Sequence, residues 1–180
     1  MKRRHLLFSL AGPALLAGCG FKLREAPDFA FESIVLNAPV TSPLLTQLRR
    51  SLEANGKVQV VAAPTPVPAG AASAAPVVVP PVPRRVVLDL VQELREKVVV
   101  GINATGQVRE FQLRTRVRFR LRSSDGRDLI PETELLQQRD ISFNEAAVLA
   151  KEAEEALLYR DMQSDLVQQL MRRLGAVRTV

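Results

Sequence analysis

Residues 110–122 read EFQLRTRVRFRLR, and apolar and basic side chains alternate along them with a period of two. The apolar positions are Phe111, Leu113, Val117, Phe119 and Leu121, and the basic positions are Arg114, Arg116, Arg118, Arg120 and Arg122. Because successive side chains of a strand point to opposite faces of the sheet, this pattern predicts a long strand with one buried and one hydrated face.

Two further long strands are expected on either side of this one in the sequence, set off by the turn sequences 103–106 and 123–126, which both end in glycine. Upstream, residues 33–37 and 58–61 are apolar and rich in β-branched side chains, as in short buried strands. We therefore predict an α+β fold. It is a two-layer sandwich with a mixed, mostly antiparallel sheet of four to five strands and two helices packed on one face.

The first predicted helix begins after Thr41 or Ser42 as the cap, has Pro43 at its first position and ends at Asn55-Gly56. The second opens with the capping-box spacing of residues 142–145 and continues for about thirty residues, to a stop at Gly175.

Apolar side chains of the second helix fall on two sides. One stripe is expected to pack on the sheet and contains Ala146, Leu149, Ala150, Ala153, Ala156, Leu157, Val167, Leu170, Met171 and Leu174. A smaller group on nearly the opposite side contains Leu158, Tyr159, Met162 and Leu166. This group is either covered by the first helix or kept for a partner, and partner contact is our hypothesis.

The N-terminus has the pattern of a bacterial lipoprotein signal. Basic residues 2–4 precede an apolar run over residues 6–16, and Leu16-Ala17-Gly18-Cys19 forms a lipobox. An apolar run of this length is too short to cross a bilayer core of roughly 30 Å. We predict removal of residues 1–18, acylation of Cys19, a tether over residues 19–28 and one domain over residues 29–180. Gly20, where aspartate would favour inner-membrane retention, indicates the periplasmic side of the outer membrane. The alternative is an ordinary signal peptide with an incidental cysteine.

Residues 63–83 contain seven of the twelve prolines and no charged side chain. Such a segment cannot bury enough apolar surface to fold alone, so we expect a Pro/Ala-rich insertion in extended conformation within the domain. A proline-rich recognition segment is the alternative.

Removal of the predicted signal lowers the net charge from +6 to +3 and takes away His5, the only histidine. Because Cys19 would carry lipid, the mature chain would have neither imidazole nor free thiol. This excludes Cys/His metal sites, disulfides and histidine-based triads, so we predict a non-enzymatic protein without metal, cofactor or nucleic acid. A hydrolase would require two carboxylates that share a pocket.

The five arginines of residues 114–122 allow three interpretations. They could form cross-strand ion pairs with acidic side chains of the neighbouring strands, namely Asp89, Glu93, Glu132, Glu134 and Asp140. They could instead bind anionic lipid, because a guanidinium matches the geometry of a phosphate, or contact a protein partner.

Several segments in order resemble the LptE family of lipopolysaccharide-assembly lipoproteins. They are residues 19–24 (CGFKLR), 48–52 (LRRSL), 110–113 (EFQL), 150–154 (AKEAE) and 168–174 (QQLMRRL). The resemblance covers the chain apart from the proline-rich insertion. It implies an α/β sandwich that sits as a plug inside the outer-membrane β-barrel LptD, assists assembly of that barrel and binds lipopolysaccharide on its way to the outer leaflet.

The resemblance also implies that Lys151 binds lipopolysaccharide. A second basic position of the family lies in the hairpin turn, where this chain has Asn103-Ala104-Thr105, and Arg109 is the candidate substitute. Arg114, Arg116 and Arg118 complete the hypothetical lipopolysaccharide-binding set. The alternative function is a structural lipoprotein that tethers another envelope complex without binding lipopolysaccharide.

Overall fold

The computed structural model describes residues 27–37, 42–62, 84–144 and 147–180. The predicted signal, Cys19 and the proline-rich insertion therefore lie outside the described residues. The elements are β1 (Ser33–Asn37), α1 (Pro43–Asn55), β2 (Gln59–Ala62), β3 (Arg85–Ile102), β4 (Val108–Ser123), β5 (Asp128–Ser142) and α2 (Val148–Ala176).

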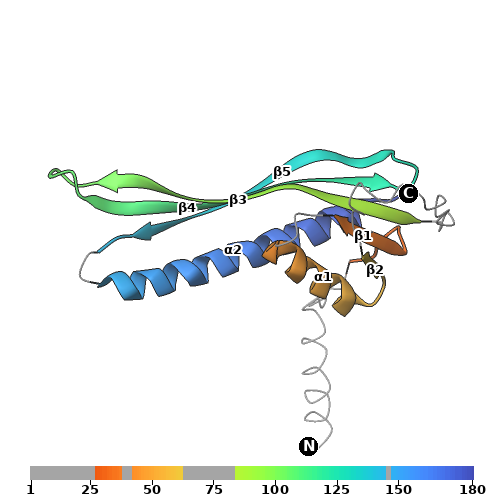
Figure 1. The fold of residues 1–180 in the computed structure, drawn as a ribbon, viewed down its shortest axis with the longest axis horizontal. Helices are drawn as coiled ribbons and strands as arrows, with labels where there is room; N and C mark the ends of the chain where they lie inside the picture. The colour runs from red at the N-terminus through yellow and green to blue at the C-terminus, as the bar shows by residue number, and fades with distance from the viewer. Residues whose placement is uncertain (1–26, 38–41, 63–83, 145–146) are drawn as a thin grey trace, which may run out of the picture.

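The strands form one sheet in the order β2-β1-β3-β4-β5. β1 runs parallel to β2 and β3, whereas β3, β4 and β5 are successively antiparallel. Both helices lie on one side of this sheet (Figure 1). The predicted mixed two-layer α+β sandwich is confirmed.

The start and end of α1 follow from its sequence. The hydroxyl of Ser42 accepts a hydrogen bond from the Leu45 backbone N–H at 3.1 Å, and Pro43 occupies the first turn. Gly56 ends the helix with φ of +70°, a conformation that costs glycine little. The cap residue and both ends of this helix were predicted.

β3, β4 and β5 form a long ribbon that extends past α1 and twists over α2 (Figure 1). We call the side of the ribbon that faces the helices its helix face and the other side its outer face. The alternation of β4 is confirmed, because Leu113, Val117, Phe119 and Leu121 are fully buried on the helix face. The distal end of the domain is the β3–β4 turn with the start of α2. The proximal end is the β4–β5 turn with the C-terminus.

The predicted start of α2 is wrong. Ser142 is the last residue of β5, paired with Glu110 of β4, and α2 begins only at Val148. Ala147 occupies the N-cap position without a side-chain hydrogen bond. Ser142 therefore extends the sheet ladder, and Gly175 lies inside a helix that ends at Ala176.

The predicted buried stripe of α2 is confirmed in the second half of the helix, where Val167, Leu170, Met171 and Leu174 are buried, and is wrong in the first half. Met162 and Leu166 are fully buried, whereas Leu149 and Leu157, which were expected to pack on the sheet, are 82% and 55% exposed. A long straight helix cannot keep one stripe against a strongly twisted ribbon, so its buried side rotates along its length.

The core has two parts of unequal size. The main core lies between α1, the second half of α2 and the proximal sheet, and includes Leu44, Leu48, Phe119, Leu166 and Leu170. The distal cluster consists of Leu113, Ile141 and Met162, with Phe111, Leu158 and Tyr159 packed around them. Neither α1 nor α2, the helices of the described residues, is long and apolar enough to cross a membrane.

Candidate functional site

The five arginines of residues 114–122 lie on the outer face of β4, and four of them form cross-strand ion pairs. Asp89 of β3 accepts from Arg120 at 2.9 Å and from Arg122 at 2.7 Å. Arg116 pairs with Glu134 at 3.5 Å, and Arg118 with Glu132 at 3.3 Å.

Arg114 differs from these four, because its Nε donates to Gln112 at 2.7 Å and not to an acid. Asp140 accepts from the same Gln112 side chain at 2.9 Å, so it pairs with an amide. Glu93 lies on the helix face. The cross-strand interpretation is therefore confirmed for Asp89, Glu132 and Glu134, and is wrong for Glu93 and Asp140.

Asp89 is the buried acid of this outer face. Burial raises the pKa of its carboxyl, but hydrogen bonds from Asn37 and Arg120, together with the charge of Arg122, outweigh that effect. The net pKa lies below the ordinary value of 3.8. Asp89 thus joins the last residue of β1 to the proximal parts of β3 and β4, through one amide and two guanidinium groups.

A second group of charges lies on the helix face of the distal ribbon. Lys97 of β3 forms an ion pair with Glu155 of α2 at 2.6 Å, and its ammonium lies 4.4 Å from the centre of the Phe111 ring. Lys151 of α2 bridges Glu154 at 2.8 Å and the Ser142 hydroxyl at 3.0 Å. Two ammonium groups therefore lie where the start of α2 meets the ribbon.

Lys97 and Lys151 line a common small pocket of about 80 Å³, whose walls include Phe111, Phe143 and Val148. The Phe111 and Phe143 rings meet edge to face with centroids 5.4 Å apart. A larger depression of about 620 Å³ adjoins it and shares Lys97, Glu152 and Glu155 with it. We call the two together the distal groove. Its remaining lining residues are Arg95, Ile141, Ser142, Ala156, Tyr159 and Arg160.

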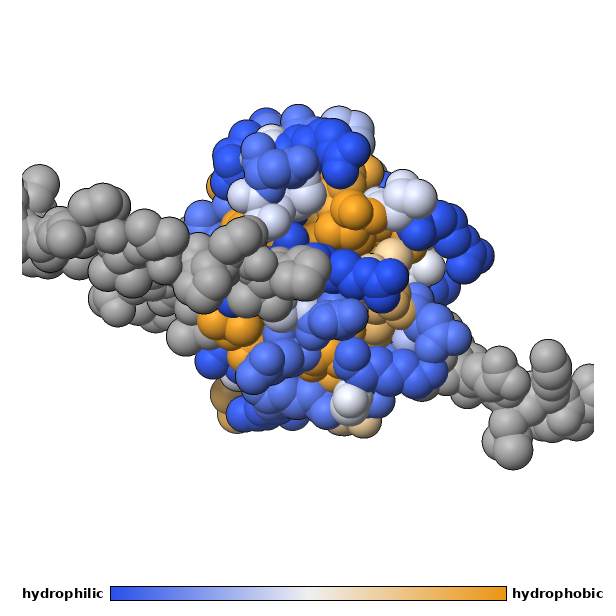
Figure 2. All heavy atoms as spheres, turned by 90° about the vertical axis from the view of Figure 1, so that its right-hand side faces the viewer, coloured by the Kyte–Doolittle hydropathy of each residue, from blue (hydrophilic) through white to orange (hydrophobic). Residues whose placement is uncertain are grey.

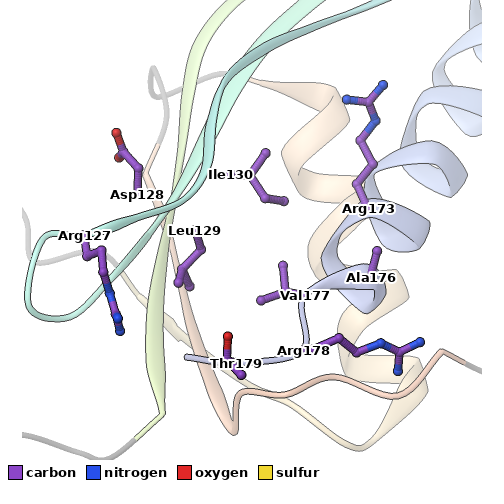
Figure 3. Close-up of a pocket in the computed structure, with 9 residues that line it drawn as sticks. All are labelled: Arg127, Asp128, Leu129, Ile130, Arg173, Ala176, Val177, Arg178 and Thr179. Atoms are coloured by element: carbon purple, nitrogen blue, oxygen red, sulfur yellow. The ribbon is translucent and has the colours of Figure 1, made fainter.

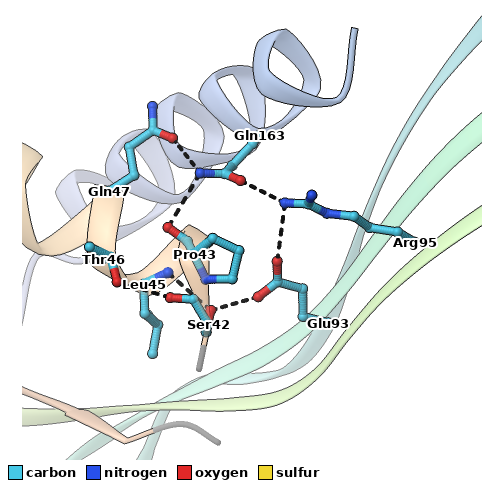
Figure 4. A network of polar contacts seen from close by, with 8 residues as sticks. All are labelled: Ser42, Pro43, Leu45, Thr46, Gln47, Glu93, Arg95 and Gln163. Atoms are coloured by element: carbon cyan, nitrogen blue, oxygen red, sulfur yellow. Dashed lines mark hydrogen bonds and ion pairs between the residues drawn. The ribbon is translucent and has the colours of Figure 1, made fainter. Parts of the chain in front are cut away.

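A polar network separates this groove from the main core. The Glu93 carboxylate accepts from the Ser42 hydroxyl at 2.6 Å and lies 3.8 Å from the Arg95 guanidinium. Arg95 in turn donates to Gln163 of α2 at 2.7 Å, and Gln163 donates to Gln47 of α1 at 2.7 Å. Figure 4 shows these side chains converging from the start of α1, from β3 and from α2. The network holds the three elements at the inner limit of the distal groove.

Tyr159 lies between this network and the groove. Its hydroxyl donates to the Glu96 backbone carbonyl at 3.0 Å, and the Arg95 guanidinium lies 5.6 Å from its ring centre. Burial, with the nearby charge of Glu155, raises the pKa of Tyr159 above 10.0 against the opposite effect of Arg95. Tyr159 therefore stays a neutral hydrogen-bond donor that fixes α2 to β3.

The structure separates the residues predicted to bind lipopolysaccharide. Lys151 lies at the distal groove. Arg109 is an exposed residue near the distal end of β4, at an irregularity in the β3–β4 pairing, and it does not line the groove. Arg114, Arg116 and Arg118 lie on the outer face. Lys97 was not predicted, because it stands in the mixed run ELREK. Its position opposite Leu113 in the β3–β4 register is the signal that places it on the helix face.

The predicted partner-contact group belongs to the core of the domain. Met162 and Leu166 are fully buried, and Leu158 and Tyr159 pack against the distal cluster. The hypothesis of partner contact is therefore wrong for Met162 and Leu166. The exposed apolar side chains of α2 are instead Val148, Leu149 and Leu157.

The distal groove is suited to noncovalent binding. Glu152 and Glu155 both line it, but Lys97 engages Glu155, so they do not form a pair of free carboxylates. Among the described residues no three His, Cys, Asp or Glu side chains cluster as metal ligands. The groove thus combines basic side chains, two glutamates and, in its small pocket, apolar and aromatic side chains.

Comparisons with known proteins assign the family. A family model described as LptE, lipopolysaccharide-assembly, matches residues 27–174. The chain belongs to the LptE family. A comparison with curated protein sequences gives no match. Family membership places the chain among the lipopolysaccharide-assembly lipoproteins, and the comparisons give no indication of catalysis.

Several solved structures of lipoproteins are similar to this one in fold. The solution structure of uncharacterized lipoprotein B from Nitrosomonas europaea is 31% identical, with a TM-score of 0.67, and the alignment covers 87% of this chain and 91% of that one. Rare lipoprotein B from Shewanella oneidensis is 20% identical, with a TM-score of 0.61 and coverage of 81% and 95%. A minor lipoprotein from Acinetobacter baumannii is 24% identical, with a TM-score of 0.59 and coverage of 84% and 96%.

Proposed function

We propose that the chain is a lipoprotein anchored through Cys19 to the periplasmic side of the outer membrane. In this proposal it plugs the LptD β-barrel, assists the assembly of that barrel and binds lipopolysaccharide during its insertion into the outer leaflet. The observation that carries the proposal, beyond family membership, is the distal groove, in which Lys97 and Lys151 stand over aromatic and aliphatic side chains.

The chemistry of the groove matches that of the proposed ligand. Lipopolysaccharide presents phosphates next to acyl chains, so a site for it needs cations beside an apolar surface. Lys97 and Lys151 each have a carboxylate partner in the free domain, Glu155 and Glu154. A phosphate can replace these carboxylates as the partner of the ammonium groups, with charge-assisted hydrogen bonds of similar kind. Arg109, exposed near the distal end of β4, is a further cation of the proposed site.

The partner surface in this proposal is the outward side of the first half of α2. Leu149 and Leu157 are exposed there, on a part of the helix that no other described element covers on that side (Figure 1). Large apolar side chains gathered on one surface are typical of interaction sites. The wall of the barrel is the proposed cover.

Binding of purified lipopolysaccharide tests the groove. We expect Lys151→Glu and Lys97→Met each to weaken binding about tenfold, the value of one charge-assisted hydrogen bond. The proposed site is limited to the groove and Arg109, and does not include Arg114, Arg116 and Arg118 of the outer face. Arg114→Glu is therefore the matched control, because it reverses a charge on the outer face without breaking an ion pair. Equal loss in all three variants would mean that binding follows total charge, which contradicts a defined site.

Mass spectrometry of proteins that co-purify with the full-length chain from detergent-solubilised outer membranes tests the partner. A stoichiometric large β-barrel supports the plug. A chain that purifies alone, or with periplasmic or inner-membrane proteins, supports the structural tether instead.

A further inference from the structure

The proximal end of the domain carries a basic surface that the proposed function does not use. A depression of about 480 Å³ lies there between the β4–β5 turn and the C-terminal residues. Figure 3 shows Leu129, Ile130, Ala176 and Val177 in its middle and three arginine side chains at its margin. The arginines are Arg127, Arg173 and Arg178.

The charges of these arginines are largely unbalanced. Within the described residues, no hydrogen bond or ion pair involves the side chain of Arg173 or Arg178. Arg127 has one exposed ion pair, with Asp125 at 3.9 Å. Asp128 is the only carboxylate side chain that lines the depression. Three guanidinium groups therefore lie around an apolar centre with two carboxylates nearby, Asp128 in the lining and Asp125 beside Arg127.

The end view of the molecule shows the same arrangement on a larger scale. Figure 2 looks onto the proximal end, where hydrophilic residues surround smaller hydrophobic areas. Leu129, Ile130 and Val177 are half-buried and pack against the main core. The apolar centre is thus a fixed part of the domain, and the arginines at its margin are free to bind an external group.

The N-terminal segment reaches the domain at this same end. A side chain at Gly175 of α2 would lie 3.0 Å from the Pro27 Cβ, so Pro27 packs on the last turn of that helix. Eight peptide steps separate Cys19 from Pro27, and a chain of that length spans at most about 28 Å. An acylated Cys19 would therefore keep the proximal arginines close to the surface of the membrane.

We propose that the proximal end binds the phosphates of anionic phospholipids in the leaflet that holds the lipid anchor, through Arg127, Arg173 and Arg178. This proposal rests on the proposed anchor at Cys19. Guanidinium groups bind phosphate oxygens in a forked geometry, and an apolar centre between them suits the boundary of headgroups and acyl chains. The anchor and the arginines would then hold the domain at two places and restrict its orientation.

This surface is separate from the proposed lipopolysaccharide site. Lys151 and Arg173 lie near opposite ends of α2, about 33 Å apart at the rise of an α-helix. Variants of one site leave the other in place. The two proposals can therefore fail independently.

A fluorescence experiment on the mature, lipidated full chain tests the proposal. A dye on Thr179→Cys reports the position of the depression, because acylation leaves no other free thiol in the chain. The protein is placed in vesicles of phosphatidylcholine, with or without phosphatidylglycerol, that contain headgroup spin-labelled lipid as quencher. We expect quenching with phosphatidylglycerol, little quenching in phosphatidylcholine alone, and reversal by salt.

The double variant Arg173→Glu/Arg178→Glu should lower the docked fraction at least tenfold in the mixed vesicles. Arg49→Glu/Arg50→Glu is the matched control, since it makes the same charge change on exposed positions of α1 and should quench like the parent. Quenching that is the same in both double variants, or in both vesicle types, overturns the proposal. If the mixed vesicles give quenching only after lipopolysaccharide is added to them, the proposal is also overturned.

Vesicle flotation separates this proposal from the proposed anchor. A chain that does not float with neutral vesicles lacks the anchor, which overturns both proposals. A chain that floats with both vesicle types but shows no quenching overturns only the binding of phospholipid by the arginines.

Discussion

The proximal and distal halves of this domain use the same three long strands in different ways. In the proximal half, α1 and the end of α2 together cover the ribbon, and an extensive apolar core fills the space between them. In the distal half α2 alone covers the ribbon, and three fully buried or nearly buried side chains form the whole cluster within the described residues. The proximal half therefore supplies most of the folding free energy, because that energy scales with buried apolar area.

In the distal half, charged side chains make part of the contact between α2 and the ribbon. These contacts include Lys97 with Glu155 and Arg139 with Asp165, at 2.6 and 2.9 Å. Exposed ion pairs of this kind contribute little to stability. They leave charged groups near the surface, where a ligand can exchange for one of the partners. The less stable half is thus the one suited to binding.

The largest expected effect is in the main core. Leu170→Ala removes a fully buried side chain from between α2 and the sheet, and should lower the free energy of unfolding by about 3–4 kcal/mol. Urea unfolding checks this, with a lower midpoint and an unchanged slope. A loss below about 1 kcal/mol would contradict the dominant role of the proximal half.

A matched truncation in the distal cluster should cost less and act locally. Met162→Ala should lower the free energy of unfolding by about 2 kcal/mol, because the small cluster can partly collapse around the cavity. Native-state hydrogen exchange should accelerate in the distal parts of β3 and β4 and stay slow in β1 and α1. Uniform acceleration through the domain would mean that the two halves unfold as one unit.

How far the sequence predicts these halves depends on the range of the interactions. The α1 boundaries follow from Ser42, Pro43 and Gly56, which act within one turn of the chain, and the face of β4 follows from its own alternation. The start of α2 does not follow from local sequence. Ser142 fits a helix cap and also a strand, and only its pairing with Glu110 of β4 makes it the last residue of β5.

The distal groove could not be predicted in full either, because it is formed by residues that are far apart in the sequence. Lys151 came from family resemblance, but Lys97 reaches it only through the β3–β4 register and the path of α2 across a twisted ribbon. The buried side of α2 rotates with that twist, so Met162 is in the core and Leu149 is in solvent. Helical periodicity alone assigns both Met162 and Leu149 to the wrong side of the helix.

Asp89 allows a comparison of a buried ion pair with exposed ones. Asp89→Asn should cost about 2 kcal/mol, because Arg120 and Arg122 lose a shared buried partner. Glu134→Gln, which removes an exposed pair with Arg116, should cost less than about 0.5 kcal/mol. Urea unfolding at neutral pH measures both.

The pH dependence of the unfolding free energy should show whether the charge of Asp89 causes this stabilisation. Its folded-state pKa is lower than the ordinary 3.8, so its stabilisation is present above that value and is lost as the pH falls through the folded-state pKa. The difference in stability between the parent and Asp89→Asn should therefore shrink on acidification below that value. A difference that stays constant through this range would show that the charge of Asp89 is not the cause.

The smallest expected effect on stability is on the exposed side of the distal helix. Leu149→Gln/Leu157→Gln changes two exposed side chains to a residue of similar helix propensity, so the free energy of unfolding should change by less than about 0.5 kcal/mol. If the barrel wall covers this side, the same variant should lose the co-purifying barrel, because two amides would be buried at the interface without partners. Asp161→Asn, also exposed on α2, should keep it. A barrel that still co-purifies with the leucine variant would place the interface elsewhere on the domain, and a large loss of stability would mean that these leucines pack within it.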